Sequence, residues 1–235
     1  MKIKRMLISI ALFTALFTII PAQGQTELTF DVWREGTTNT YHAVSQTTPS
    51  SYTGTLKFVV ESAVGELVSL GGGNIIFTAG DFNLGSAYFK FYDPADITFA
   101  GQGIDVTVLR NWSSASGDTE PFNCSNCDRL TIRDMTIVAG GPVRSTSDAI
   151  DLDDGDDNVI ERVKITSARG RAIVFDGKGT ENGGHADGNI IRNCVITGTI
   201  PYDGIQMLAS NDNRIEGCTI TGVGRHGIYA VKSSD

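Results

Sequence analysis

The chain has 235 residues, of which 40% are apolar, and its formal net charge is −8 at pH 7. A chain of this length and composition can bury one sizeable core, which excludes an intrinsically disordered protein. The negative charge argues against nucleic acid as a partner, because binding to phosphate backbones needs basic surfaces.

Residues 1–24 predict a secretory signal peptide. Lys2, Lys4 and Arg5 precede an apolar run over residues 6–20, and small residues follow it. A membrane anchor is disfavoured, because this run is shorter than the roughly 20 residues of a spanning helix. We therefore expect a secreted, cell-surface or periplasmic protein with no membrane span after cleavage. Removal of the three basic residues would change the formal charge from −8 to −11.

Residues 25–55 are interpreted as an N-terminal extension, and a repetitive domain is expected over residues 56–235. Residues 56–70 carry apolar side chains at helical spacing and run into three consecutive glycines, which predicts a short helix. We expect this helix to cap the N-terminal end of the domain and to cover exposed strand edges. Strand-like segments follow at residues 74–77, 88–92, 97–99 and 106–109.

The second half of the chain repeats one polar-apolar segment. Its copies cover residues 157–166, 188–197 and 212–221, with a fainter copy at residues 128–137. The apolar residues alternate with period two, which is typical of strands. A second short strand accompanies each copy. These second strands are expected to centre on Ile150, Ile173, Ile205 and Ile228.

The spacing of the copies predicts a solenoid. Ile150 and Ile165 are 15 residues apart, as are Ile205 and Ile220, and one full turn takes about 23 residues. Repeats of this length cannot bury their apolar faces alone and must stack. We therefore expect an all-β, right-handed parallel β-helix in which Ile165, Ile196 and Ile220 lie one above another. No second cap is visible, so the domain is expected to be truncated at its C-terminal end.

Insertions and cysteines interrupt the regular pattern. Residues 139–147 and 177–187 break the spacing and are expected to form loops beside a cleft. Cys194 and Cys218 fall at the same inward position of successive turns, where they either bond or stack, and stacking is favoured. The Cys124 to Cys127 pair is interpreted as a local disulfide, because a zinc site would need a second such pair.

The densest polar segment contains six aspartates within residues 147–157. If the apolar residues between them point inward, Asp151 and Asp153 point outward, and Asp176 takes the place of Asp153 one turn later. Carboxylates at that separation can bind Ca²⁺, or can share a proton so that one pKa is raised. Alternatively, aspartates in a turn bond the local backbone and keep a strand edge soluble.

Two histidines lie near the predicted strands. His226 comes just before the last strand and is either a general acid or base or a structural histidine. His185 lies close to Asp187 in the second insertion, and this pair alone does not define a site.

Two longer segments carry a family resemblance. The strings ELVSLGGGNIIFTAGDFNLG (residues 66–85) and DITFAGQGIDVTVLR (residues 96–110), together with the repeats, resemble the pectate-lyase-like superfamily of right-handed parallel β-helix proteins. The resemblance covers about residues 56–235. It implies a polysaccharide bound along the outer face of one parallel sheet, without deciding between a lyase, a hydrolase, an epimerase and a non-catalytic binder.

Shorter motifs resemble those of two enzyme families with this fold. Residues 146–151 look like the N-T-D-G-I-D segment of polygalacturonases, which implies that Asp148 is an acid. One turn later, however, Gly170 and Arg171 stand where that family has an Asp-Asp pair, which counts against such a hydrolase. Residues 175–178, followed by Asp203-Gly204 and residues 225–227, are similar to the F-D-P-H, D-G and R-H-G segments of mannuronan C5-epimerases. Lys178 replaces the histidine of that family.

These observations favour an enzyme, a lyase acting on uronic-acid-containing polysaccharide, over a non-catalytic carbohydrate-binding or adhesive protein. A C5-epimerase or glycoside hydrolase of the same fold is a further alternative. Lyases and C5-epimerases both begin by removing the proton next to a uronate carboxylate, while a cation stabilises the enolate. The expected catalytic residues are Lys178, Arg171, Asp148, Asp203 and His226. The expected calcium ligands are Asp151, Asp153 and Asp176.

Overall fold

The computed structural model describes residues 27–112, 119–141, 147–177 and 184–231. The predicted signal peptide and Lys178 lie outside these residues, so secretion stays a prediction. The same holds for the expected cleft loops, which lie partly outside the described residues. Within the described part of the chain, no helix has the length and apolar character that crossing a membrane requires.

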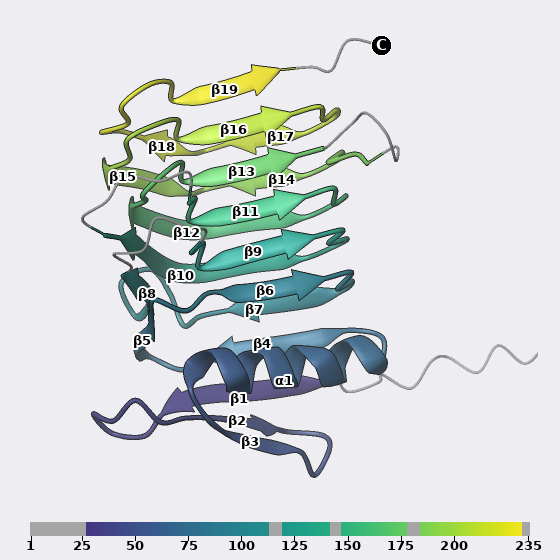
Figure 1. Cartoon of the computed structure of the whole chain (residues 1–235). Helices are drawn as coiled ribbons and strands as arrows, with labels where there is room; N and C mark the ends of the chain where they lie inside the picture. The colour runs from purple at the N-terminus through teal and green to yellow at the C-terminus, as the bar shows by residue number, and fades with distance from the viewer. Residues whose placement is uncertain (1–26, 113–118, 142–146, 178–183, 232–235) are drawn as a thin grey trace, which may run out of the picture.

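Two sheets form the walls of a coil whose turns stack along one axis (Figure 1). Sheet B contains β6 (Phe89–Tyr92), β9 (Phe122–Ser125), β11 (Ile150–Asp153), β13 (Ile173–Asp176), β16 (Ile205–Leu208) and β19 (Ile228–Val231). All of its strands pair in parallel, and each strand between the edge strands β6 and β19 pairs with the strands of the turns before and after it. The predicted all-β parallel β-helix with a short helix is therefore confirmed.

Sheet A forms the remaining walls. It contains β1 (Thr29–Arg34), β2 (Tyr41–Ser45), β3 (Ser51–Gly54), β4 (Gly73–Phe77), β5 (Gly80–Gly85), β7 (Ile97–Ala100), β8 (Thr107–Trp112), β10 (Thr131–Gly140), β12 (Val159–Ser167), β14 (Ile190–Arg192), β15 (Val195–Thr199), β17 (Arg214–Glu216) and β18 (Thr219–Ile220). Strand β1 pairs in parallel with β4 and antiparallel with β2, and β2 pairs antiparallel with β3. The first three strands thus extend sheet A beyond the coil.

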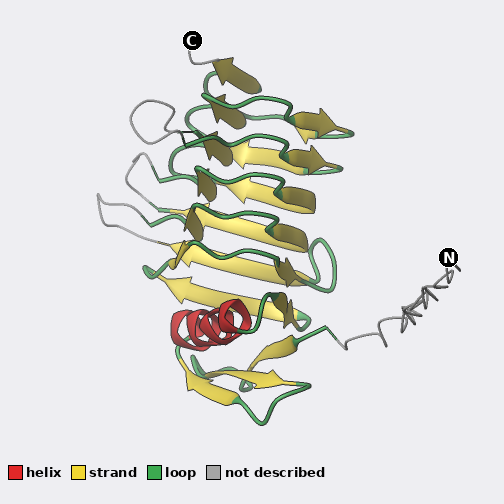
Figure 2. Ribbon diagram, turned by 90° about the vertical axis from the view of Figure 1, so that its right-hand side faces the viewer, coloured by secondary structure: helices red, strands yellow, loops and turns green. Residues whose placement is uncertain are grey.

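Helix α1 (Leu56–Ser69) lies across the N-terminal end of sheet B (Figures 1 and 2). The Thr55 hydroxyl caps it by accepting a hydrogen bond from the Phe58 amide. Its apolar stripe is buried, except that Leu70, expected to continue the stripe, follows the helix and is 52% exposed. Two polar side chains of α1 complete the edge of β6. Lys57 donates to the Tyr88 carbonyl, and Glu61 accepts from the Lys90 amide. The helix therefore covers an exposed strand edge, as expected.

The interior contains the stacked residues that the repeats predict. Ile165 pairs with Ile196, and Ile196 pairs with Ile220, in the register of β12, β15 and β18. The second strands differ from expectation in one respect. Ile150, Ile173, Ile205 and Ile228 are the first residues of their strands rather than the central ones. Their predicted alignment across successive turns is confirmed.

The cysteines follow the favoured interpretation. Cys124 and Cys127 form a disulfide. Cys194 and Cys218 are free thiols on neighbouring turns, and burial raises the pKa of Cys194 to about 12. The two thiols therefore act as small apolar side chains in the stack.

Buried asparagines join successive turns at the start of the sheet A strands. The Oδ1 atom of Asn189 accepts the Asn158 amide at 2.8 Å, and its Nδ2 atom donates to the Gly155 carbonyl at 3.1 Å. The Asn189 amide donates in turn to Oδ1 of Asn213 at 2.7 Å. Asn158 and Asn189 are fully buried. This row therefore satisfies backbone groups that water cannot reach.

Replacing Asn189 with alanine is expected to lower the free energy of unfolding by about 3 kcal/mol. The substitution leaves two buried backbone groups without partners, and each costs about 1–3 kcal/mol. Urea denaturation measures the loss. Asn211→Ala is the control, because the Asn211 side chain is exposed and bonds only Asp187 among the described residues. Equal losses in the two variants would contradict the proposed role of the buried row.

Candidate functional site

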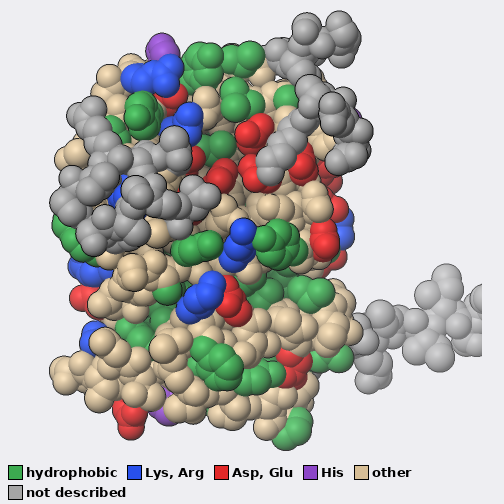
Figure 3. Space-filling model, in the orientation of Figure 1, with side chains coloured by type: hydrophobic (Ala, Val, Ile, Leu, Met, Phe, Trp, Pro, Cys, Tyr) green, Lys and Arg blue, Asp and Glu red, His purple; other side chains and the backbone are tan. Residues whose placement is uncertain are grey.

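A groove of about 510 Å³ runs along the outer face of sheet B. Outward side chains of β6, β9, β11, β13 and β16 line it, together with residues that precede these strands. Figure 3 shows this face, with acidic side chains gathered over the right-hand ends of the strands and basic side chains at the upper left. A groove in which polar side chains with perturbed pKa values converge is a candidate binding site.

Three predicted calcium ligands project from the floor of this groove. Asp153 of β11 pairs with Asp176 of β13, and Asp151 pairs with Val174. The expected register is confirmed. Because neighbouring strands lie about 4.8 Å apart, the carboxylates of Asp153 and Asp176 are surface neighbours.

The Asp151 carboxyl group lies at the centre of an acidic cluster. It is half-buried, and burial is the main cause that raises its pKa to about 8. The negative charges of the surrounding carboxylates raise the pKa further. In order of effect, these belong to Asp153, Asp148, Glu120 and Asp176. Asp151 therefore keeps its proton at neutral pH in the presence of charged carboxylates.

A second row of polar residues lies along the edge of the groove where the sheet B strands begin. Each member stands two residues before the first residue of its strand. This edge ladder consists of Glu120, Asp148, Arg171, Asp203 and His226. Backbone hydrogen bonds hold the turns in line, such as the Ala172 amide to the Asp203 carbonyl. Four of the five predicted catalytic residues thus belong to one row, and Lys178 lies outside the described residues.

From Asp148 onward, acidic and basic residues alternate along the edge ladder. Asp148 is buried, accepts the Arg171 amide at 2.5 Å and faces the Arg171 guanidinium at 3.5 Å. Burial raises the pKa of Asp148 to about 7. The other side of Arg171 faces Asp203, with 4.0 Å between Nε and Oδ2. Arg171 is therefore held between two carboxylates.

Asp203 is fully buried. Its Oδ1 atom accepts the His226 amide at 3.1 Å and lies 2.8 Å from Nδ1 of His226. Its Oδ2 atom accepts no hydrogen bond from the described residues and faces the guanidinium groups of Arg171 and Arg225. A side chain without exposed surface cannot touch a substrate. We therefore interpret Asp203 as a positioning residue for His226 and the two arginines, which differs from its expected catalytic role.

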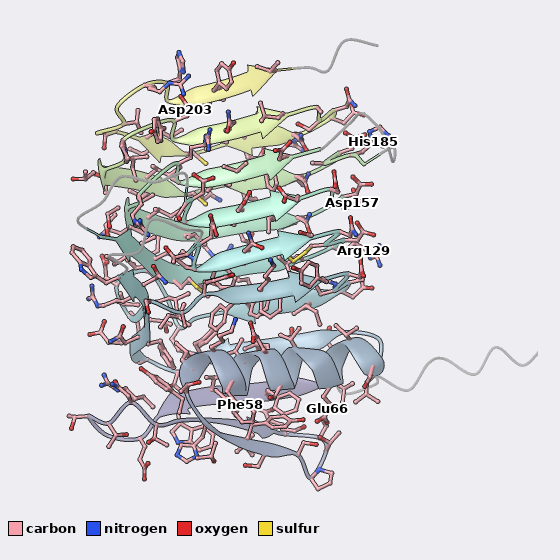
Figure 4. All side chains as sticks on the ribbon, in the orientation of Figure 1. Phe58, Glu66, Arg129, Asp157, His185 and Asp203 are labelled. Atoms are coloured by element: carbon pink, nitrogen blue, oxygen red, sulfur yellow. A yellow bond between two sulfur atoms is a disulfide. The ribbon has the colours of Figure 1, made fainter. Side chains whose placement is uncertain are left out.

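The other aspartates of residues 147–157 have turn roles. Asp154 and Asp157 adopt positive φ values of 50° and 56°, and Asp157 lies at the turns on the side opposite Asp203 (Figure 4). Asp156 accepts the Asp187 amide at 2.8 Å. Asp187 likewise accepts the Asn211 amide. For this half of the segment, the turn interpretation is correct.

Several groove residues were not expected from the sequence. Lys90 and Asn123 precede Asp151 in the outward row, Gln206 follows Val174, and Glu120 begins the edge ladder. The signal for Glu120 is its place two residues before Phe122, which is visible only once β9 is recognised as a sheet B strand.

The acidic groove does not present a ready calcium site. Among the described residues, no group of three His, Cys, Asp or Glu side chains is placed to hold a metal ion. Asp151, Asp153 and Asp176 share one face without converging on one point. Calcium therefore stays a prediction, and we derive no chemical step through a metal.

Comparison with known proteins supports the fold. Residues 120–235 match the family model described as a right handed beta helix region. A crystal structure of a candidate glycosyl hydrolase from Parabacteroides merdae superposes with a TM-score of 0.54 at 14% identity, covering 74% of this chain and 90% of that one. No curated protein sequence matches significantly.

Two weaker structural matches come from Azotobacter vinelandii. The A-module of the mannuronan C-5 epimerase AlgE6 gives a TM-score of 0.47 at 15% identity, covering 73% of this chain and 54% of that one. The A-module of AlgE4 gives a TM-score of 0.39 at 14% identity, covering 73% and 55%. The expected right-handed β-helix is confirmed by the family model and by the Parabacteroides merdae structure, and the chemistry must be argued from the groove.

Proposed function

Starting from a chain whose residues 120–235 form a right-handed β-helix region, we propose that the sheet B groove hydrolyses glycosidic bonds in a polysaccharide. Asp151 is the proposed general acid, and the carboxylates of Asp153 and Asp176 are the proposed partners. One observation carries the proposal. A carboxyl group in the centre of the groove keeps its proton up to about pH 8, and the carboxyl groups of Asp153 and Asp176 lie on the same face of the sheet. Glycosidases combine a protonated and an ionised carboxyl group in this way.

Proton transfer explains the two roles. The protonated Asp151 would donate to the oxygen of the bond that breaks, and an ionised neighbour would activate water on the opposite face of the sugar. Positions two residues apart on a strand, such as those of Asp151 and Asp153, are separated by roughly 6.6 Å. This spacing fits the wider carboxylate separation of inverting glycosidases, which leaves room for a water molecule.

The lyase interpretation has less support. A lyase needs a base for the proton next to a uronate carboxylate and a cation for that carboxylate. Among the described residues that line the groove, the cations are Lys90 and Arg171. Arg171 is already held by Asp148 and Asp203. A uronate beside Asp151 would also meet the acidic cluster, which would repel it.

The products of polysaccharide cleavage test the proposal. The full chain would be incubated with acidic and neutral polysaccharides, with and without Ca²⁺. We expect new reducing ends without the ultraviolet absorbance of unsaturated sugars. Unsaturated products would instead establish a lyase. Binding without new reducing ends would exclude hydrolysis and leave a non-catalytic binder or a C5-epimerase. A requirement for Ca²⁺ would support the calcium prediction.

The pH dependence of kcat/KM is a separate prediction. A general acid works only while it is protonated, so the rate should fall as the pH rises through about 8, the pKa of Asp151. Above that value we expect about a tenfold loss per pH unit. Initial rates measured between pH 5 and pH 10 give the profile. A rate that stays constant up to pH 10 would exclude Asp151 as the acid.

A further inference from the structure

A cationic and aromatic surface lies at the C-terminal end of the groove. We define it as the arginine-tyrosine patch, formed by Tyr202, Arg225, His226 and Tyr229. The Arg225 guanidinium lies 6.0 Å from the ring centre of Tyr202 and 5.9 Å from that of Tyr229. The His226 ring stacks on Tyr229 at 5.2 Å, with 20° between the ring planes. The patch therefore combines flat ring surfaces with a cation fixed between them.

The patch continues the row that contains the proposed acid. Asp151 aligns with Val174, Val174 with Gln206, and Gln206 with Tyr229. Three strand spacings of about 4.8 Å place Tyr229 roughly 14 Å from Asp151 along the axis of the coil. A polysaccharide lying along the groove would therefore reach the patch a few sugar residues away from the bond at Asp151.

The charge of the patch is opposite to that of the groove centre. The single carboxylate of Asp203 is shared between Arg171 at 4.0 Å and Arg225 at 3.8 Å, and it also bonds His226. The side chains of Arg225 and His226 are 45% and 51% exposed, whereas Asp203 is fully buried. Solvent therefore meets the Arg225 guanidinium and the His226 ring. A ligand carboxylate at this position would continue the alternation of acidic and basic groups that begins at Asp148.

We propose that the arginine-tyrosine patch binds a uronic acid residue of the substrate. The apolar face of the sugar would stack on a tyrosine ring, and its carboxylate would pair with Arg225. The acidic cluster at Asp151 favours a neutral sugar at the cleaved bond. The substrate is thus a mixed polysaccharide with uronic acid and neutral residues. This inference rests on the proposed function for the placement of the cleaved bond, and the binding itself can be tested alone.

Calorimetric titration of the full chain tests the subsite. The probes are trisaccharides of galacturonate, glucuronate and mannuronate, each compared with its carboxyl-reduced counterpart. At least one acidic trisaccharide should bind about tenfold more tightly than its reduced form, and added salt should weaken that preference. Arg225→Gln should remove the preference and leave binding of the reduced form unchanged, and Arg225→Lys should restore part of it.

The matched control is Arg214→Gln, because Arg214 in β17 of sheet A is 65% exposed. It should leave the preference intact, and melting temperatures would show that both arginine variants fold. Equal affinity of acidic and reduced forms in the wild type, or an unchanged preference in Arg225→Gln, would overturn the subsite. A sulfated trisaccharide that binds more tightly than every uronate would overturn the assignment to a carboxylate.

Asp151→Asn separates this inference from the proposed hydrolysis. The variant should retain the preference for the acidic trisaccharide, because Asp151 lies three strands from Tyr229. If Asp151→Asn keeps full hydrolytic activity while Arg225→Gln loses the preference, the subsite stands and the proposed acid is wrong. The reverse result would retain the acid and reject the subsite.

Discussion

Asp151→Asn should lower kcat on a cleaved polysaccharide by about a thousandfold. The amide has nearly the shape of the acid but cannot donate the proton that the departing sugar needs, and general acid catalysis contributes about 10²–10⁴-fold. The outward position on β11 and the neighbouring charge of Asp153 stay as they are. Because binding contacts remain, KM should change little. Initial rates at pH 6, where Asp151 is protonated, give the comparison.

The same variant should change how stability depends on pH. The pKa of Asp151 rises from 3.8 to about 8 on folding, so the folded state holds a proton that the unfolded state releases. This contribution to stability is complete below about pH 4 and is lost as the pH rises through about 8. The asparagine of Asp151→Asn does not titrate. The melting temperature of the variant, relative to that of the wild type, should therefore increase as the pH rises from 4 to 9.

Asp81→Asn is the matched control for both measurements. Asp81 lies in β5 of sheet A, and its side chain is 53% exposed and pairs with Arg110. We expect wild-type kcat and no gain in relative melting temperature with rising pH. Full activity of Asp151→Asn would reject the acid assignment. A stability difference that is independent of pH would show that Asp151 is ionised in the folded state.

The sequence was sufficient to predict the coil and the register of its strands. A period of about 23 residues, with isoleucines at fixed offsets, admits only stacked turns. It also contained most of the edge ladder. Asp148, Arg171, Asp203 and His226 each stand two residues before an isoleucine that begins a sheet B strand. The ladder was missed as a row because those isoleucines were expected at strand centres.

The sequence alone could not show which aspartate of the site has a raised pKa. Spacing placed Asp151 and Asp153 on one face, but the raised pKa of Asp151 arises from burial and from carboxylates on other turns. Glu120 is one of these, and it precedes Asp148 by 28 residues rather than about 23. Composition also could not show which aspartates of residues 147–157 lie in turns and which lie in the groove. Asp154 and Asp157 differ from Asp151 through backbone conformation, with positive φ at both turn positions.

Phe99→Ala is expected to lower the free energy of unfolding by about 4 kcal/mol, the largest stability effect among the changes considered. Phe99 of β7 is fully buried, and its ring lies 5.4 Å from Phe91 and 5.3 Å from Phe122. These contacts join sheet A to sheet B across the interior. Removing a buried phenylalanine ring costs about 3–5 kcal/mol, because transfer energy is lost and a cavity remains. Urea denaturation measures the change.

Phe58→Ala is the control of the same residue type, because Phe58 on α1 is 52% exposed and should cost less than about 0.5 kcal/mol. The location of the destabilised strands can be measured separately. Each turn of a solenoid contacts only its neighbours, so a cavity between β6, β7 and β9 should weaken that region first. Hydrogen exchange in Phe99→Ala should therefore accelerate more in these strands than in β17 and β18. A uniform increase along the chain would show that the coil unfolds as one unit, because the turns would then share their stability.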